Sequence, residues 1–130
     1  MKSLGGIGWI ILPCENIETL DAWYREKLGF TPLDKKGVVQ YDLGGVLVEL
    51  SGFSKRDTSA PRRFFYRDAA IILRARKVEQ TIEDLKAKGV PFISDLIQIP
   101  GGKVAFFHDP EGHVWGVQER VDDPWAQGED

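Results

Sequence analysis

Hydrophobic and polar positions follow the same pattern in the two halves of the chain. Residues 9–28 contain a short apolar run, a polar break and a segment whose apolar residues recur at helical spacing, and residues 70–89 repeat this order. Ile10-Ile11-Leu12 in the first half returns as Ile71-Ile72-Leu73 in the second. The repeat predicts two modules, each of which begins with a strand and an amphipathic helix.

The predicted helices have recognisable ends. Asn16 suits the N-cap of the first helix, because its side chain can accept a hydrogen bond from an exposed amide of the first turn. Gly29 and Gly89 stand where helices commonly end, since glycine adopts the left-handed conformation at little cost.

Three strand-like runs follow each helix. They occupy 30–33, 38–42 and 46–51 in the first module, and 90–94, 103–108 and 113–119 in the second. Turn sequences at 42–45 and 109–112 separate neighbouring runs. The chain therefore reads as β-α-β-β-β twice.

Two polar segments lie outside these modules. Residues 52–67 are polar and contain Pro61, so they are expected to be a linker. The acidic tail, 121–130, is expected to fray. Trp125 in this tail has three interpretations: it docks on the body, it docks on a second chain, or it belongs to a disordered remnant.

Alternation along the strands predicts two unlike faces in each module. In 46–51, the side chains of Val46, Val48 and Leu50 share one face, which suits packing under a helix. The opposite face carries Leu47 and Glu49. Each predicted strand is likewise apolar on one face and mixed on the other. The mixed faces are expected either to form a concave pocket or to face solvent.

Composition narrows the class of protein. The 130 residues suit one domain, with 17 basic and 20 acidic residues and a net charge of −3. This balance argues against a nucleic-acid partner and against an anionic membrane surface. The apolar run 7–12 is too short for a signal core or a membrane span. The single cysteine, Cys14, forms no internal disulfide, is expected to be a small buried hydrophobe, and fits a cytoplasmic protein.

The sequence Phe106-Phe107-His108-Asp109-Pro110-Glu111-Gly112-His113, together with the paired modules and Lys27-Leu28-Gly29-Phe30, resembles the vicinal oxygen chelate (VOC) superfamily. This group includes glyoxalase I, the fosfomycin and bleomycin resistance proteins and the extradiol dioxygenases. The resemblance implies an α+β, glyoxalase-like fold whose two βαβββ modules form an incomplete barrel around a concave pocket. It also implies a homodimer. The single VOC domain, 1–130, would then consist of modules at 5–51 and 68–120, the linker at 52–67 and the tail at 121–130.

The resemblance also implies where a metal would bind. Metal-dependent members place histidine, glutamate or glutamine at four matched positions, which here hold Trp9, Glu49, Ala70 and Gly116. Only Glu49 is a metal ligand by type, whereas a catalytic zinc takes three or four protein ligands. His108 and His113 are expected to be surface or turn histidines. No metal cofactor is therefore expected.

The first hypothesis is a protein that binds a small, mostly apolar or aromatic molecule. Trp9 and Phe106 would stack on this ligand, and Ala70 and Gly116 would leave room for it. Arg74 would either anchor an anionic group or lie exposed at a strand end. The candidate ligand-binding residues are Trp9, Ile11, Leu47, Glu49, Ala70, Ile72, Arg74, Phe106, Gly116 and Gln118.

Two alternatives stay open. The chain could be a lyase, isomerase or dioxygenase that uses a rebuilt metal site or Glu49 as a catalytic acid or base. Glu49 could instead be a solvated carboxylate or a partner of Arg74. The other alternative is a structural or regulatory module with a vestigial pocket.

Overall fold

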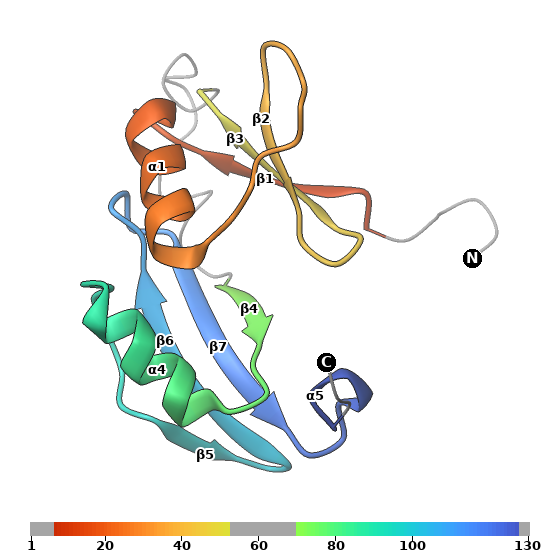
Figure 1. Cartoon of the computed structure of the whole chain (residues 1–130), viewed down its shortest axis with the longest axis vertical. Helices are drawn as coiled ribbons and strands as arrows, with labels where there is room; N and C mark the ends of the chain where they lie inside the picture. The colour runs from red at the N-terminus through yellow and green to blue at the C-terminus, as the bar shows by residue number, and fades with distance from the viewer. Residues whose placement is uncertain (1–6, 53–69, 128–130) are drawn as a thin grey trace, which may run out of the picture. The chain divides into compact units, whose positions relative to one another are not determined.

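The computed structural model describes residues 7–52 and 70–127, and it has a mixed α+β architecture. The chain divides into two compact units, Met1–Arg67 and Asp68–Asp130. Each unit contains one open sheet, of three strands in the first and four in the second (Figure 1). Apart from Gly52, the predicted linker 52–67 lies outside the described residues, as do residues 5–6 at the predicted start of the first module.

The first unit is a β-α-β-β module. It comprises β1 (Trp9–Pro13), α1 (Ile17–Trp23), a π-helical continuation η1 (Tyr24–Leu28), β2 (Val39–Asp42) and β3 (Leu47–Ser51). The strand order is β1-β3-β2, with β1 parallel and β2 antiparallel to β3. The predicted helix ends are confirmed: the Asn16 side chain accepts from the Thr19 N–H at 3.0 Å, and Gly29 ends the helix at φ 71°.

The strand predicted at residues 30–33 is wrong. This segment is irregular, and only the Leu33 N–H joins it to β2, by donating to the Gln40 carbonyl at 2.8 Å. Pro32 has no N–H to add to a ladder. The Phe30 ring packs against Tyr24 and Tyr41, at centroid distances of 5.6 and 5.4 Å. An aromatic cluster under the helix therefore takes the place of a fourth strand.

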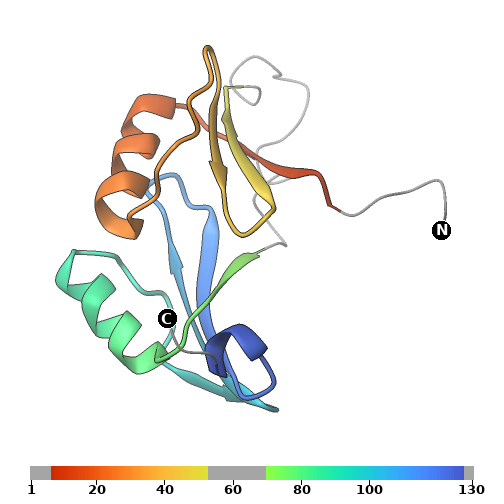
Figure 2. The same ribbon diagram turned by 45° about the vertical axis from the view of Figure 1, so that its right-hand side comes forward.

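The second unit has the larger sheet. Its elements are β4 (Ala70–Arg74), α4 (Val78–Ala87), β5 (Ile97–Ile99), β6 (Gly102–His108), β7 (Val114–Arg120) and α5 (Pro124–Gln127). The order is β4-β7-β6-β5, in which β4 runs parallel to β7 and the other neighbours are antiparallel. In Figure 2, α4 covers one face of this sheet, and α5 follows β7 on the other side.

Two expectations about the second unit are corrected. Residues 90–94 form no extended strand; Phe92 makes an isolated bridge to Phe107, and the strand β5 begins later, at Ile97. The tail does not fray over residues 121–127. The Arg76 guanidinium lies 4.1 Å from the centre of the Trp125 ring, and its Nε donates to the Trp125 carbonyl at 3.2 Å. Of the three interpretations of Trp125, docking on the body is confirmed.

One face of each sheet is buried, as the alternation predicts. Val48 and Leu50 are buried in the first unit, and His113, Trp115 and Val117 are buried in the second. Cys14 is completely buried, as expected, and its Sγ lies 3.5 Å from the Ser51 carbonyl. Within the described residues, no helix is long and apolar enough to cross a membrane.

The first unit also contains a buried phenol linked to an ion pair. The Tyr41 hydroxyl donates to Asp21 Oδ1 at 2.6 Å, and Asp21 Oδ2 lies 2.8 Å from an Arg25 guanidinium nitrogen. Burial, followed by the hydrogen bond to Asp21, raises the pKa of Tyr41 well above 10.0, the ordinary value for tyrosine. The folded state therefore keeps Tyr41 neutral at pH values where the unfolded chain ionises it.

Tyr41→Phe should lower the free energy of unfolding at pH 8 by about 1–3 kcal/mol, because Asp21 loses a buried donor. Between pH 8 and pH 11 the wild type should lose a further ~1.4 kcal/mol relative to the variant, since only the wild type has a Tyr41 that ionises on unfolding. Urea denaturation of both proteins at pH 8 and pH 11 measures this difference. A gap between the two proteins that stays constant would contradict the assignment.

Candidate functional site

Four of the candidate residues lie together on the first sheet, on the face opposite α1. Trp9 and Ile11 of β1 are the register partners of Leu47 and Glu49 of β3. We call this set, Trp9, Ile11, Leu47 and Glu49, the first mixed face. Trp9 is 59% and Ile11 48% exposed, although both are large apolar residues. This surface therefore presents apolar side chains to water around one carboxylate.

A short chain of hydrogen bonds holds the Glu49 carboxylate. Gln40, its cross-strand partner on β2, donates from Nε2 to Glu49 Oε1 at 2.6 Å. Lys35 Nζ in turn donates to Gln40 Oε1 at 2.7 Å. Gln40 was missed by the sequence analysis, although the predicted turn at 42–45 places it opposite Glu49 by counting along the hairpin. The Gln40 amide thus links the carboxylate to the Lys35 ammonium group.

The other six candidates share one face of the second sheet. We call them the second mixed face, on the side opposite α4: Ala70, Ile72, Arg74, Phe106, Gly116 and Gln118. In the middle of this face Gly116 pairs with Ile72 on one side and Phe106 on the other. One step along, Gln118 pairs with Arg74. The structure thus places four of the ten candidates on the first sheet and six on the second.

The room expected above Gly116 is already filled. A β-carbon at this position would lie 2.8 Å from Ile72 Cδ1, 3.1 Å from Phe106 Cδ1 and 3.2 Å from the Ala105 carbonyl oxygen. Gly116 is buried, because its two large neighbours close over it. Its role on this face is to let Ile72 and Phe106 approach each other, and the expected free volume above it is not there. The sequence could show the missing side chain but not which neighbours occupy the space.

A pocket of about 350 Å³ lies beside Ile72, at the C-terminal ends of β4 and β7. All of its lining residues belong to the second unit. They include three candidates, Ile72, Arg74 and Gln118, together with Arg120, Asp122 and Asp123, which the sequence analysis missed. Alternation could have found Arg120, since it continues the series Gly116, Gln118. The two aspartates gave no such signal, because they follow the strand in the segment that was expected to fray.

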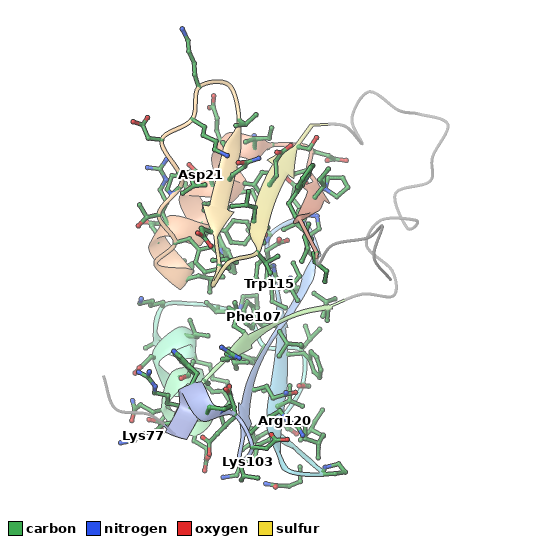
Figure 3. The ribbon with its side chains drawn as sticks, turned by 90° about the vertical axis from the view of Figure 1, so that its right-hand side faces the viewer. Asp21, Lys77, Lys103, Phe107, Trp115 and Arg120 are labelled. Atoms are coloured by element: carbon green, nitrogen blue, oxygen red, sulfur yellow. The ribbon has the colours of Figure 1, made fainter. Side chains whose placement is uncertain are left out.

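Arg74 lies exposed at the end of β4. Its side chain is 66% exposed, and its Nε lies 3.2 Å from Asp123 Oδ2. Arg120, at the end of β7 (Figure 3), donates from Nε to Asp122 Oδ1 at 2.9 Å and from Nη2 to Oδ2 at 3.3 Å. The hydrogen bond from Arg120 lowers the pKa of the Asp122 carboxyl. Two guanidinium groups and two carboxylates therefore meet at one end of the pocket.

The donor groups do not fit a divalent metal ion. At the four matched positions only Glu49 offers a ligand atom, since Trp9 has only an N–H donor and Ala70 and Gly116 have no donor side chain. Among residues 7–52 and 70–127, no three His, Cys, Asp or Glu side chains gather closely enough to share an ion. Zinc sites in proteins use three or four such ligands.

Both histidines serve the turn between β6 and β7. His113 is 4% exposed, and its Nδ1 lies 2.7 Å from Oδ2 of the fully buried Asp109. His108 Nδ1 lies 2.8 Å from the Asp109 carbonyl oxygen. The expectation of turn histidines is confirmed, although His113 is buried and not a surface residue.

Comparison with known proteins gives a consistent result. A sequence model described as Glyoxalase/Bleomycin resistance protein/Dioxygenase superfamily matches residues 6–117. A comparison with curated proteins gave no match.

Solved structures show the same fold. The crystal structure of TnmS3, an antibiotic binding protein from Streptomyces sp. CB03234, is 21% identical, with a TM-score of 0.73 over 92% of this chain and 98% of the other. UcmS2 is 22% identical, with a TM-score of 0.72 over 88% of this chain and 98% of the other. A glyoxalase/bleomycin resistance protein/dioxygenase from Nocardioides is 22% identical, with a TM-score of 0.66 over 98% and 90%.

Proposed function

Since the chain belongs to the Glyoxalase/Bleomycin resistance protein/Dioxygenase superfamily, we propose that it binds a small, mostly apolar or aromatic molecule without the metal centre of its metal-dependent relatives. The observation that carries this proposal is the exposure of large apolar side chains on the two mixed faces. Trp9 and Ile11 are about half exposed, and Ile72 on the second mixed face is 39% exposed.

These side chains lie where water would be displaced by a ligand. Burying apolar surface is favourable by roughly 25 cal/mol per Å², so each of these residues gains when it is covered. Exposed apolar groups that cluster on one face commonly mark a binding surface. The polar groups beside them are few: Glu49 on the first mixed face, and Arg74 and Gln118 on the second. A largely apolar surface with few polar groups is typical of small-molecule sites.

The structural comparisons support this class of ligand by analogy. TnmS3, which shares the fold, is an antibiotic binding protein. At 21% identity the likeness concerns the fold, and the same fold hosts different functions. Binding by this chain is therefore inferred from its own exposed residues, and TnmS3 adds that a protein of this fold binds an antibiotic.

An enzyme is the second candidate, and one observation favours it. The Glu49 carboxylate lies on the first mixed face and is oriented by Gln40 at 2.6 Å. An oriented carboxylate beside apolar groups can act as a general base when it reaches a substrate proton. Glu49→Gln should abolish turnover of any substrate that depends on this base, while a pure binding protein would keep most of its affinity.

A second copy of the chain is another way to cover the exposed apolar residues. β1 and β4 are edge strands, and β1 carries Trp9 and Ile11. We therefore propose a homodimer, which light scattering after size-exclusion chromatography should report as twice the 14.6 kDa of the chain. A mass of one chain at high concentration would contradict the dimer and leave both mixed faces to the ligand.

A neutral aromatic probe tests ligand binding. Calorimetric titration with 2-naphthamide should give a saturable signal, and Ile72→Ala should weaken binding about tenfold, because it removes an apolar contact. Ile93→Ala is the matched control, since Ile93 is 53% exposed but lies outside both mixed faces. Equal losses in Ile93→Ala and Ile72→Ala would contradict a site on these faces.

The metal content of the protein tests the proposal that it has no metal centre. The protein is purified without a metal-affinity tag, incubated with Zn²⁺, Mn²⁺, Ni²⁺ and Fe²⁺, and then desalted. Elemental mass spectrometry should find far less than one ion per chain, because one carboxylate cannot replace the hydration of a divalent ion. About one ion per chain that is lost in Glu49→Ala would overturn the metal-free proposal and favour the enzyme.

A further inference from the structure

The pocket at the ends of β4 and β7 contains more charge than an apolar ligand needs. Arg74 and Arg120 project from neighbouring strands, with Ile72 and Gln118 beside them. Each guanidinium faces an aspartate of the same unit: Arg74 faces Asp123, and Arg120 faces Asp122. We call the site formed by Ile72, Arg74, Gln118 and Arg120 the arginine pocket.

The two basic and the two acidic groups differ in how firmly they are held. The arginines stand on β4 and β7, which are paired with each other in a five-residue parallel register from Ala70 to Arg74. Asp122 and Asp123 belong to the segment between β7 and α5. This segment is attached by the Val121 N–H, which donates to the Gly101 carbonyl at 2.9 Å, and by Trp125, whose ring lies 4.1 Å from the Arg76 guanidinium and whose carbonyl accepts from Arg76 at 3.2 Å. The arginines thus stand on paired strands and the acids on a short connecting segment, in which Asp123 Oδ1 also accepts from the Trp125 N–H at 3.0 Å.

The two ion pairs differ in exposure. The side chains of Arg120 and Asp122 are 37% and 66% exposed, whereas that of Arg74 is 66% and that of Asp123 only 11% exposed. A pair as exposed as Arg120–Asp122 adds little to stability, because water screens it and ordering the side chains costs entropy. Within the described residues, Arg74 contacts Asp123 through Nε alone. An incoming carboxylate that engages a guanidinium through two parallel hydrogen bonds makes a stronger contact than this one.

We propose that the arginine pocket binds the carboxylate of an aromatic acid, and that Asp122 and Asp123 occupy the two arginines until such a ligand displaces them. The aromatic part of the ligand would pack on Ile72, and its carboxylate would take the places of the aspartate oxygens. This proposal rests on the proposed function, and it specifies the chemical class of the ligand.

The test compares two probes of the same shape. The full chain is titrated calorimetrically with 2-naphthoate and with the neutral 2-naphthamide at low salt. We expect naphthoate to bind about tenfold more tightly, because only naphthoate offers a carboxylate to the arginines. Added sodium chloride should reduce this advantage, because it screens partly exposed charges.

Variants separate the arginines from the aspartates. In Arg74→Gln/Arg120→Gln the preference for naphthoate should disappear, so that naphthoate and naphthamide bind with similar affinity. Asp122→Asn/Asp123→Asn should tighten naphthoate binding about fivefold, because the internal competitors lose their charge. Arg25→Gln is the matched control, since Arg25 also forms an exposed pair with an aspartate, but in the first unit. It should leave the preference intact.

Displacement of the tail has its own readout. Saturating naphthoate should speed hydrogen exchange of the amides of residues 121–127 in the wild type, and naphthamide should not. This measurement does not depend on whether any variant folds.

The outcomes distinguish the two proposals. No naphthoate binding, equal affinity for both probes, or weaker naphthoate binding in Asp122→Asn/Asp123→Asn overturns the arginine pocket. If Ile72→Ala still weakens naphthamide binding in that case, the proposed function stands. If instead the arginines govern naphthoate binding while naphthamide gives no saturable signal, the arginine pocket stands as an anion site and the proposed function fails.

Discussion

The buried carboxylate of Asp109 determines the geometry on which the second unit depends. Its Oδ1 accepts from the Glu111 and His113 amides at 2.9 and 3.0 Å, and its Oδ2 faces His113 Nδ1 at 2.7 Å. These contacts fix the turn between β6 and β7, and therefore the register of the two strands. A slip of one residue would turn every side chain of β7 to the other face. Trp115 would leave the core, and Gln118 and Arg120 would leave the pocket.

Most of the fold that could be predicted from the sequence was predicted from the alternation of side chains and the internal repeat. They identified the two modules, the strands that begin them, both helices and the mixed faces, because periodicity reports directly which side of an element is buried. Phe30–Leu33 was misassigned because its apolar residues serve an aromatic cluster, which depends on the distant Tyr41. The filled space over Gly116 also depends on neighbours in other strands. Such long-range packing has no signature in a local pattern.

The two halves of the repeat have diverged at the four positions where metal-dependent relatives hold their ligands. The first module has the large or charged residue of each matched pair and the second module has the small one: Trp9 corresponds to Ala70, and Glu49 corresponds to Gly116. The first mixed face consequently has the large Trp9 side chain and the Glu49 carboxylate. On the second mixed face, Ile72 and Phe106 close over the glycine, and the charge lies farther along the strands, at Arg74 and Arg120. The chain thus retains the scaffold with a different distribution of polar groups.

The rate at which Cys14 reacts with a thiol reagent reports on the opening of the first unit. It is the only cysteine of the chain, and its thiol is completely buried near the Ser51 carbonyl. A thiol reagent can reach it only when this part of the first unit opens, so the labelling rate measures the free energy of that opening. The second unit contains no thiol, so it is not labelled in the same experiment. The ratio of the labelling rate to the rate of global unfolding therefore reports whether the two modules of the repeat open together or one at a time.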